Sequence, residues 1–209
     1  MSATNKTIQT IQHVSNEYHF YLLGPIEEEK NYLEFLHMLR TATQSDQIHI
    51  HISSPGGYVS TMAQIIHTME QSEAELIGHL EGICHSAATF IFLSCDRWYI
   101  NENSMLLFHA LSGGFWGESH KAISSANAMH EWGIRYAEKC YFPFLSKKEI
   151  KKLTEGKDIW MFGDEVAKRI EDNVIPHREK LIEEQEAKLR EDAKHKVMEF
   201  AASCQESDS

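Results

Sequence analysis

Residues 47–57, which read QIHIHISSPGG, constrain the fold more than any other part of the chain. Isoleucines alternate there with His49 and His51, and strict alternation of apolar and polar side chains predicts a half-buried β-strand. The Ser-Pro-Gly-Gly sequence breaks that strand. Apolar residues then recur at helical spacing: Met62, Ile65, Ile66 and Met69. The segment therefore predicts a strand, a tight turn and a helix in direct succession.

The same succession repeats along the chain. Strands are expected at residues 18–23, 47–52, 74–80, 97–100 and 105–109. Helices are expected at residues 28–42, directly after residue 57, from Ser86 to about residue 94, at residues 118–140 and at residues 164–171. A further short helix is expected before Gly156, opened by a capping box of Ser146 and Glu149. We expect residues 82–86 to form the turn after the third strand. Strands that alternate with helices predict an α/β fold with a mainly parallel sheet.

The two ends of the chain differ from this body. We expect residues 1–16 to form a polar, partly flexible lead and Pro176 to end the periodic body at residues 17–176. Residues 177–209 are rich in charged side chains and predict a helical extension. Its weak apolar stripe consists of Ile182, Leu189, Ala193, Val197 and Phe200. Such a helix is either solvated, with charge pairs one turn apart, or docked on a neighbouring subunit.

Composition narrows the functional class. The chain has 20 Lys and Arg against 31 Asp and Glu, a net charge of −11, which argues against nucleic-acid binding. Its 4 cysteines show no CxxC pair, so we expect no disulfide framework and no structural zinc site, and a cytoplasmic setting fits. We expect no signal peptide and no membrane span, because the longest apolar stretch, residues 87–95, is far shorter than ~20 residues.

Ser86, His109 and Asp158 are the candidate catalytic residues. Ser86 opens an apolar helix after a strand, where a hydroxyl is exposed and backbone N–H groups are unpaired; the alternative role is a helix N-cap. His109 ends a strand, and an unperturbed imidazole, with a pKa of ~6.5, can accept a hydroxyl proton near neutral pH. Asp158 precedes an apolar run that would partly desolvate it, and such a carboxylate can orient an imidazole. Each residue alone has an ordinary structural alternative.

Two further features have possible chemistry. Gly56 and Gly57 allow a close approach of the backbone to a substrate, as an oxyanion hole requires, or simply make a tight turn. His49 and His51 share one strand face and suggest a metal pair. The sequence shows no third ligand at a useful spacing, so we expect no metal site there.

In this order, the segments resemble the proteolytic subunit of the Clp protease, a serine peptidase family of the crotonase-like superfamily. The resemblance extends from about His19 to Ile175. It depends on the strand before Ser-Pro-Gly-Gly, on Ser86 four residues after Gly82, on the NSMLLFH sequence ending at His109, and on the DIWM sequence beginning at Asp158. The flanks differ, because Cys84 and His85 precede the serine where the family usually has small residues.

The resemblance implies a crotonase-like fold of repeated ββα units, with a protruding handle at about residues 110–145 and an extra C-terminal helix. It implies that residues 17–176 form the catalytic domain, that Ser86, His109 and Asp158 are a triad, and that Gly56 or Gly57 acts with Ala87 as the oxyanion hole. Gly113 and Gly114 would lie on a strand that pairs with the peptide. No cofactor or metal is implied.

The partners implied by the resemblance are other copies of the chain in a heptameric ring or two stacked rings, an unfolded polypeptide or short peptide as substrate, and an ATP-driven unfoldase. The predicted function is that of a serine endopeptidase. Two alternatives stay open: a catalytically silent ring or scaffold subunit, and an acyl-CoA hydratase or isomerase of the same superfold. The second would need acid/base glutamates and a coenzyme A site, which the sequence does not show.

Overall fold

The structure, a computed structural model, describes residues 14–113 and 117–206, and the side chains up to residue 196. Its strands are β1 (Glu17–Leu23), β2 (Gln47–Ser54), β3 (Glu75–His85), β4 (Arg97–Ile100), β5 (Met105–Phe108) and β6 (Ile159–Phe162). They form one sheet in the order β1-β2-β3-β5-β6, with β4 also paired to β3. All pairs are parallel except β5 with β6. The expected α/β fold with a mainly parallel sheet is confirmed.

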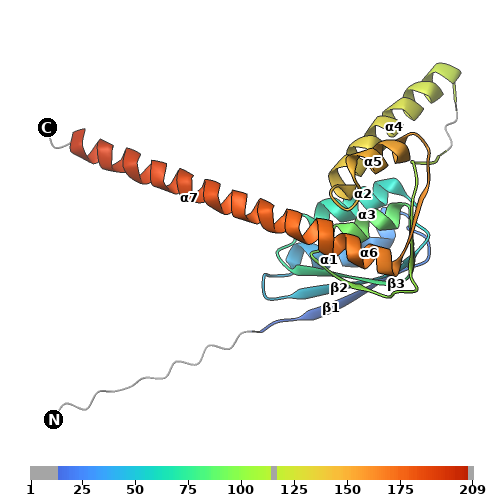
Figure 1. The fold of residues 1–209 in the computed structure, drawn as a ribbon, viewed down its shortest axis with the longest axis horizontal. Helices are drawn as coiled ribbons and strands as arrows, with labels where there is room; N and C mark the ends of the chain where they lie inside the picture. Colours follow the sequence, from blue (N-terminus) through green and yellow to red (C-terminus); the bar gives the residue numbers. More distant parts are fainter. Residues whose placement is uncertain (1–13, 114–116, 207–209) are drawn as a thin grey trace, which may run out of the picture.

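The alternation in β2 sorts its side chains between two faces. Its isoleucines, Ile48, Ile50 and Ile52, are fully buried under the helices, whereas His51 is only half-buried on the opposite face. The helices of the body are η1 (Glu29–Tyr32), α1 (Leu33–Thr41), α2 (Val59–Met69), α3 (Ala87–Leu93) and α6 (Gly163–Arg169). Figure 1 shows the helices α1, α2, α3 and α6 on one side of β1, β2 and β3. The core therefore lies between this helical layer and the sheet.

Strand β3 is longer than the sequence predicts, and this length positions the candidate site. It runs through Gly82 to His85, so the expected turn at residues 82–86 is wrong apart from Ser86. Gly82 leaves room for the neighbouring strand: a Cβ there would lie 2.6 Å from Ser53 Oγ, and that hydroxyl would have to rotate away. Residues 77–80 pair with β4 and residues 83–85 pair with β5. The end of β3 therefore lies directly beside β5.

Helices α4 (Ser119–Tyr141) and α5 (Lys147–Thr154) extend from the body (Figure 1). Of the α4 side chains, only Ala137 and Tyr141 are buried. The predicted capping box of α5 is confirmed: the Glu149 N–H donates to Ser146 Oγ, and the Ser146 N–H donates to the Glu149 carboxylate. Arg169 adds a third contact, because its Nη2 lies 3.0 Å from Glu149 Oε1. This network attaches α5 to α6.

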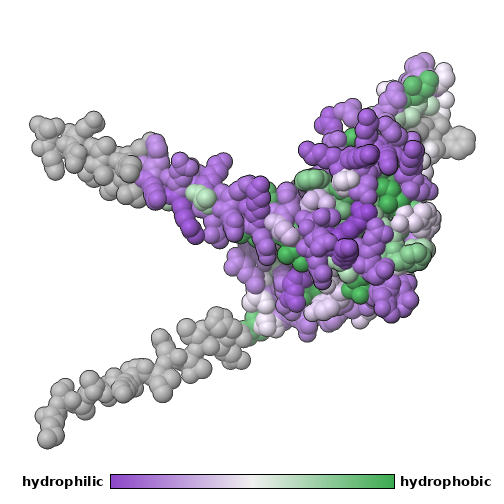
Figure 2. Space-filling model, in the orientation of Figure 1, coloured by the Kyte–Doolittle hydropathy of each residue, from purple (hydrophilic) through white to green (hydrophobic). Residues whose placement is uncertain are grey.

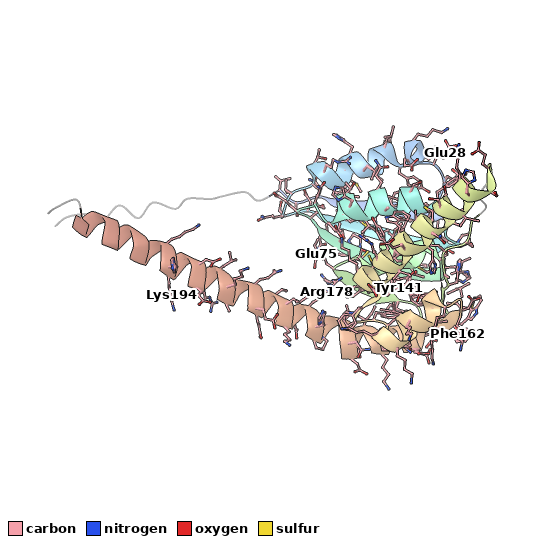
Figure 3. All side chains as sticks on the ribbon, turned by 90° about the horizontal axis from the view of Figure 1, so that it is seen from above. Glu28, Glu75, Tyr141, Phe162, Arg178 and Lys194 are labelled. Atoms are coloured by element: carbon pink, nitrogen blue, oxygen red, sulfur yellow. The ribbon has the colours of Figure 1, made fainter. Side chains whose placement is uncertain are left out.

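The C-terminal helix, α7 (Ile175–Glu206), continues from α6 through the π-helical segment η2 (Ile170–Val174). The sequence predicts that the periodic body ends at Pro176, but the helical structure does not stop there. Pro176 lies inside the first turn of α7, where a proline is tolerated. The Arg178 guanidinium lies over the Trp98 ring, at 4.6 Å, and donates to the carbonyl oxygens of Leu93 and Asp96. In Figure 3, Arg178 lies close to the body and Lys194 lies far out along α7.

Beyond its first turns, α7 projects away from the body (Figure 1). The side chains of residues 183–196 are all exposed, and Figure 2 shows the helix as mainly hydrophilic. Ion pairs one turn apart, Lys180 with Glu184 and Arg190 with Glu186, are present as expected. Ile182, Leu189 and Ala193 of the predicted apolar stripe are exposed. The remainder of the stripe, Val197 and Phe200, lies outside the described side chains.

Candidate active site

Ser86 forms a strained turn between β3 and α3. Its φ of 56° and ψ of −125° are unusual for a residue with a Cβ, and it is the one non-glycine residue with positive φ in the described part of the chain. The Ser86 N–H donates to the Leu107 carbonyl oxygen at 2.8 Å, which ties the turn to β5. The Ser86 side chain makes no capping hydrogen bond to α3. The Ser86 hydroxyl therefore does not act as a helix N-cap, which was the structural alternative to a catalytic role.

The Ser86 carbonyl group is held by α3 and α4 together. It accepts hydrogen bonds from the Thr89 N–H, at 3.0 Å, and from the Thr89 hydroxyl, at 2.6 Å. Because that hydroxyl proton is committed to Ser86, the buried Tyr141 hydroxyl must donate to Thr89 Oγ1, at 2.8 Å. Figure 3 shows Tyr141 at the end of α4 next to the body. The base of α4 is therefore coupled to the turn that presents Ser86.

The Ser-Pro-Gly-Gly loop lies against this turn. Gly56 has a φ of +88°, and a Cβ there would lie 2.6 Å from the His85 carbonyl oxygen and 2.8 Å from Ser86 Cβ. Only glycine satisfies both the backbone conformation and the approach. The same Cβ would lie 3.0 Å from the nitrogen of Ala87, the first residue of α3. The loop and the Ala87 N–H are therefore adjacent, as an oxyanion hole made of backbone donors requires.

The two glycines of the loop are not equivalent. The Gly56 N–H donates to Ser54 Oγ, at 3.1 Å and fully buried. Gly57 pairs with Ile26 in an isolated parallel bridge, and a Cβ there would lie 2.1 Å from the Ile26 carbonyl oxygen. Because the Gly56 donor already has a partner, Gly57 is the better candidate for a free N–H at the loop.

His109 follows β5 directly and is half-buried. Its Nδ1 lies 2.6 Å from the carbonyl oxygen of Ala110, which accepts only, so Nδ1 carries the proton. The neutral imidazole then has its lone pair on Nε2, the atom that a general base beside Ser86 would use.

Asp158 is brought opposite His109 by the pairing of β5 with β6. Phe108 pairs with Ile159 in the antiparallel register, so the next residue of β5 and the preceding residue of β6 face each other. His85 pairs with Leu107 in the parallel register of β3 with β5, which places Ser86 beside the end of β5 as well. The three predicted residues therefore lie at adjacent strand ends.

The side chains of these residues are not hydrogen-bonded to one another in the single chain. Asp158 is exposed, and the described residues show no hydrogen bond from it to His109, or from His109 to Ser86. An acid, an imidazole and a hydroxyl at neighbouring positions can transfer a proton from the hydroxyl once the side chains align. The backbone places the three residues at neighbouring positions in the order Asp158, His109, Ser86. Rotation of the side chains is needed to align them for proton transfer.

His85 is a neighbour of the site that the sequence marks as an unusual, bulky flank of Ser86, able to alter the adjacent subsite. Its ring packs edge-on against Trp160, with centroids 5.4 Å apart, and its Nε2 is buried without a hydrogen-bond partner among the described residues. Burial, and then the nearby His109, lower the pKa of His85. A neutral imidazole therefore borders the serine. The sequence signal for this neighbour is the position of His85, one residue before Ser86.

Gly113 is exposed and lies in an irregular segment after β5, and Gly114 lies outside the described residues. The predicted peptide-pairing strand is therefore not visible in this single chain up to residue 113. Leu111 of this segment packs on α4, where a Cβ at Gly133 would lie 2.5 Å from Leu111 Cδ1. Helix α4 thus contacts the segment that would line a bound peptide.

The sequence model of the Clp proteases matches residues 2–178, which is most of the chain and includes every element from β1 to η2. The chain belongs to the Clp protease family. Members of this family are serine peptidases. No individual curated protein matches the chain at a significant level.

The Clp protease match ends where α7 leaves the body. Arg178, the last matched residue, is also the residue that anchors α7 on Trp98. The exposed part of α7 therefore lies beyond the family region. In residues 14–113 and 117–206, no helix combines the length and the apolar character that crossing a bilayer requires.

Proposed function

We propose that this Clp protease family member is a cytoplasmic serine endopeptidase that hydrolyses peptide bonds of unfolded polypeptides or short peptides inside a homo-oligomeric ring. The observation that supports it best is the strand register that places Ser86, His109 and Asp158 at adjacent strand ends. The strained Ser86 backbone is the second support, because strain of this kind concentrates at functional sites. The fold would be the crotonase-like fold of the family, with residues 17–176 as catalytic domain.

In the proposed mechanism, Ser86 Oγ attacks the peptide carbonyl carbon while His109 Nε2 takes the hydroxyl proton. His109 then donates that proton to the leaving amine, and water repeats the sequence to release the acyl group. Asp158 would replace the Ala110 carbonyl as the acceptor of the His109 Nδ1 proton and would stabilise the imidazolium. The tetrahedral oxyanion would accept hydrogen bonds from the Ala87 N–H and from the loop, with Gly57 favoured over Gly56.

Ring assembly is part of the proposal and is supported by α4. Its side chains Ile123 and Met129 are 63% and 37% exposed in the single chain, and such apolar exposure on a projecting helix suits contact with another copy. We propose that α4 and the Gly113–Gly114 segment form the handle between stacked rings and that a peptide pairs with this segment. An ATP-driven unfoldase would deliver longer substrates.

The alternative of a catalytically silent ring subunit is favoured by one observation, the missing hydrogen bonds between the three side chains. Labelling with a fluorophosphonate separates the two functions, because the reagent reacts only with an activated serine. We expect Ser86 to be labelled and fluorogenic peptides to be cleaved by the native oligomer.

The decisive variant is Ser86→Ala, with Ser94→Ala as the matched control on the same helix. Ser94 Oγ donates to the Phe90 carbonyl and is remote from the strand ends. We expect Ser86→Ala to lose labelling and turnover while native mass spectrometry shows the same oligomer, and Ser94→Ala to keep both. Labelling that persists in Ser86→Ala would refute the triad, and an unlabelled but assembled native protein would favour the silent subunit.

A further inference from the structure

The face of the sheet opposite the helices carries a row of rings that the proposed peptidase does not use. Tyr21, His51, His79 and Tyr99 occupy paired positions on β1, β2, β3 and β4. Their rings are stacked in order, with centroid separations of 4.6 Å, 4.4 Å and 4.9 Å. Two histidines therefore lie side by side at the centre of the sheet, on strands that are rigidly paired.

Two more histidines pack against this row. His19 Nδ1 lies 3.0 Å from His51 Nε2, and His49 Nδ1 lies 2.8 Å from His79 Nε2. A nitrogen–nitrogen hydrogen bond needs one ring to offer a lone pair, so each of these contacts requires a deprotonated nitrogen. Each of the two pairs therefore contains at least one neutral imidazole ring.

Carboxylates border the cluster at both ends. Glu81 Oε1 lies 2.7 Å from His51 Nδ1, and the Glu81 side chain is 49% exposed. Glu17 Oε1 lies 3.0 Å from His49 Nε2, but the contact is not aligned as a hydrogen bond. That buried nitrogen consequently has no hydrogen-bond partner in the described part of the chain, although His49 itself is only 8% exposed.

We propose that His51, His79 and Glu81 bind a divalent transition metal ion, with Zn²⁺ as the ion that fits the donors best. One donor atom from each residue lies within 4.8 Å of the others. Neutral imidazole and carboxylate are typical zinc ligands, at about 2.0–2.2 Å from the ion. Tetrahedral coordination would bring the donors to about 3.3 Å from one another, and rotation of the exposed Glu81 side chain supplies the movement.

The surroundings suit such a site. His51 Nδ1 faces Glu81, so this nitrogen can bind the ion while Nε2 keeps its contact with His19. An outer contact of this type fixes the orientation and tautomer of a ligand ring. The donors come from two adjacent strands, β2 and β3, which holds them with little loss of conformational freedom. Water would complete the coordination on the exposed side.

The experiment is a zinc titration of the full-length protein, made without an affinity tag and freed of metal with a chelator. Isothermal titration with ZnCl₂ should show one ion bound per chain. His51→Gln and His79→Gln should each weaken binding at least about 10-fold, and the double variant should abolish it. His37→Gln and His67→Gln are the matched controls, because both residues are exposed on helices α1 and α2. They should bind zinc as the unsubstituted protein does.

Two further measurements keep the test independent of folding and of the active site. Glu81→Gln changes an exposed side chain, so it should keep the fold while weakening zinc binding, and zinc at 100-fold excess over Kd should raise Tm by about 5–10 °C only in proteins that bind it. Substitution of Co²⁺ should give the visible absorption of a four- or five-coordinate ion. Absence of stoichiometric binding, binding unchanged in His51→Gln/His79→Gln, or binding lost in His85→Gln instead would overturn the proposal.

Discussion

Ile159 of β6 lies opposite Phe108 of β5, and this antiparallel pair places Asp158 opposite His109. The relationship belongs to the backbone, so a change of rotamer cannot remove it. The present partner of His109 Nδ1, the Ala110 carbonyl oxygen, can be exchanged by rotation of one side chain. The register is therefore the stronger guide to function than the hydrogen bond seen in the single chain.

The register predicts that Asp158 acts through His109. Asp158→Asn should lower kcat about 100- to 10,000-fold, because an amide cannot stabilise the imidazolium. Peptide hydrolysis by the native oligomer measures this. Asp164→Asn, another exposed aspartate a few residues further along, is the control and should keep full activity. Equal rates for Asp158→Asn and the control would exclude the carboxylate from the mechanism.

Gly56 is predicted to be essential for reasons of space as well as conformation. Alanine there would place its Cβ 2.6 Å from the His85 carbonyl oxygen, at a φ of +88°. We expect Gly56→Ala to abolish peptidase activity and to lower the free energy of unfolding by about 3 kcal/mol or more, as measured by urea denaturation.

Gly24→Ala separates the two effects. Gly24 has a similar φ of +81°, but a Cβ there would meet no atom within 4 Å. Its substitution should cost only about 1 kcal/mol and leave the activity unchanged. If both variants lost stability and activity equally, the close approach of the loop to Ser86 would have no special role.

Thr89 is predicted to be a positioning residue for the serine turn. Thr89→Val removes the hydrogen bond to the Ser86 carbonyl and leaves the buried Tyr141 hydroxyl without its acceptor. The free energy of unfolding should fall by about 1–3 kcal/mol, and kcat should fall with KM nearly unchanged. Tyr141→Phe keeps the bond to Ser86, so it should cost about 1 kcal/mol and spare kcat. A kcat loss of the same size in both variants would contradict the assignment.

The arrangement of elements could be predicted from sequence because periodicity reports burial directly. The isoleucines of β2, the helical spacing in α2 and the capping box at Ser146 all appear in the structure as expected. Gly82 was misread as a turn, because the reason for this glycine is the Ser53 side chain of another strand. Contacts between distant segments leave no local periodicity.

In the candidate sites, too, local sequence features could be predicted and contacts between distant segments could not. The order of Ser86, His109 and Asp158 along the chain was readable, whereas the Ala110 contact of His109 was not. The histidine cluster was missed because its ligands come from two strands. His49 and His51 on β2 share one face with His79 and Glu81 on β3, and that parity was visible in the sequence. Recognising it required the register of the two strands.

The Glu149 network predicts a loss of stability in acid. Burial opposes ionisation of Glu149, but hydrogen bonds from Arg169 and Ser146 outweigh it and lower its pKa from 4.5 to about 2. A carboxylate with a depressed pKa stabilises the folded state above its unfolded pKa, and this contribution disappears as the pH falls from about 4.5 to about 2.

Urea denaturation at several pH values measures this contribution. Glu149→Gln should lower the free energy of unfolding at pH 7 by about 1–3 kcal/mol and make it less dependent on pH between about 5 and 2. Glu165→Gln, which also removes a contact to Arg169 but is more exposed, should have a smaller effect. An unchanged pH dependence in Glu149→Gln would show that other carboxylates dominate the acid response.

Helix α7 is predicted to be dispensable for the fold beyond its first turns. Its last described anchor is Arg178, and residues 183–196 contribute exposed side chains and ion pairs of small energetic value. A chain ending at residue 184 should keep its Tm within about 2 °C, whereas Arg178→Ala should lower it by several degrees, because that change removes the Trp98 stacking and two carbonyl contacts.

Native mass spectrometry of the truncated chain then distinguishes the two roles expected for the extension. An unchanged oligomer indicates a solvated arm, and loss of the oligomer at unchanged Tm indicates that the arm docks on a neighbouring subunit. A large fall in Tm of the truncated chain itself would contradict the prediction, because it would mean that residues beyond 184 stabilise the body.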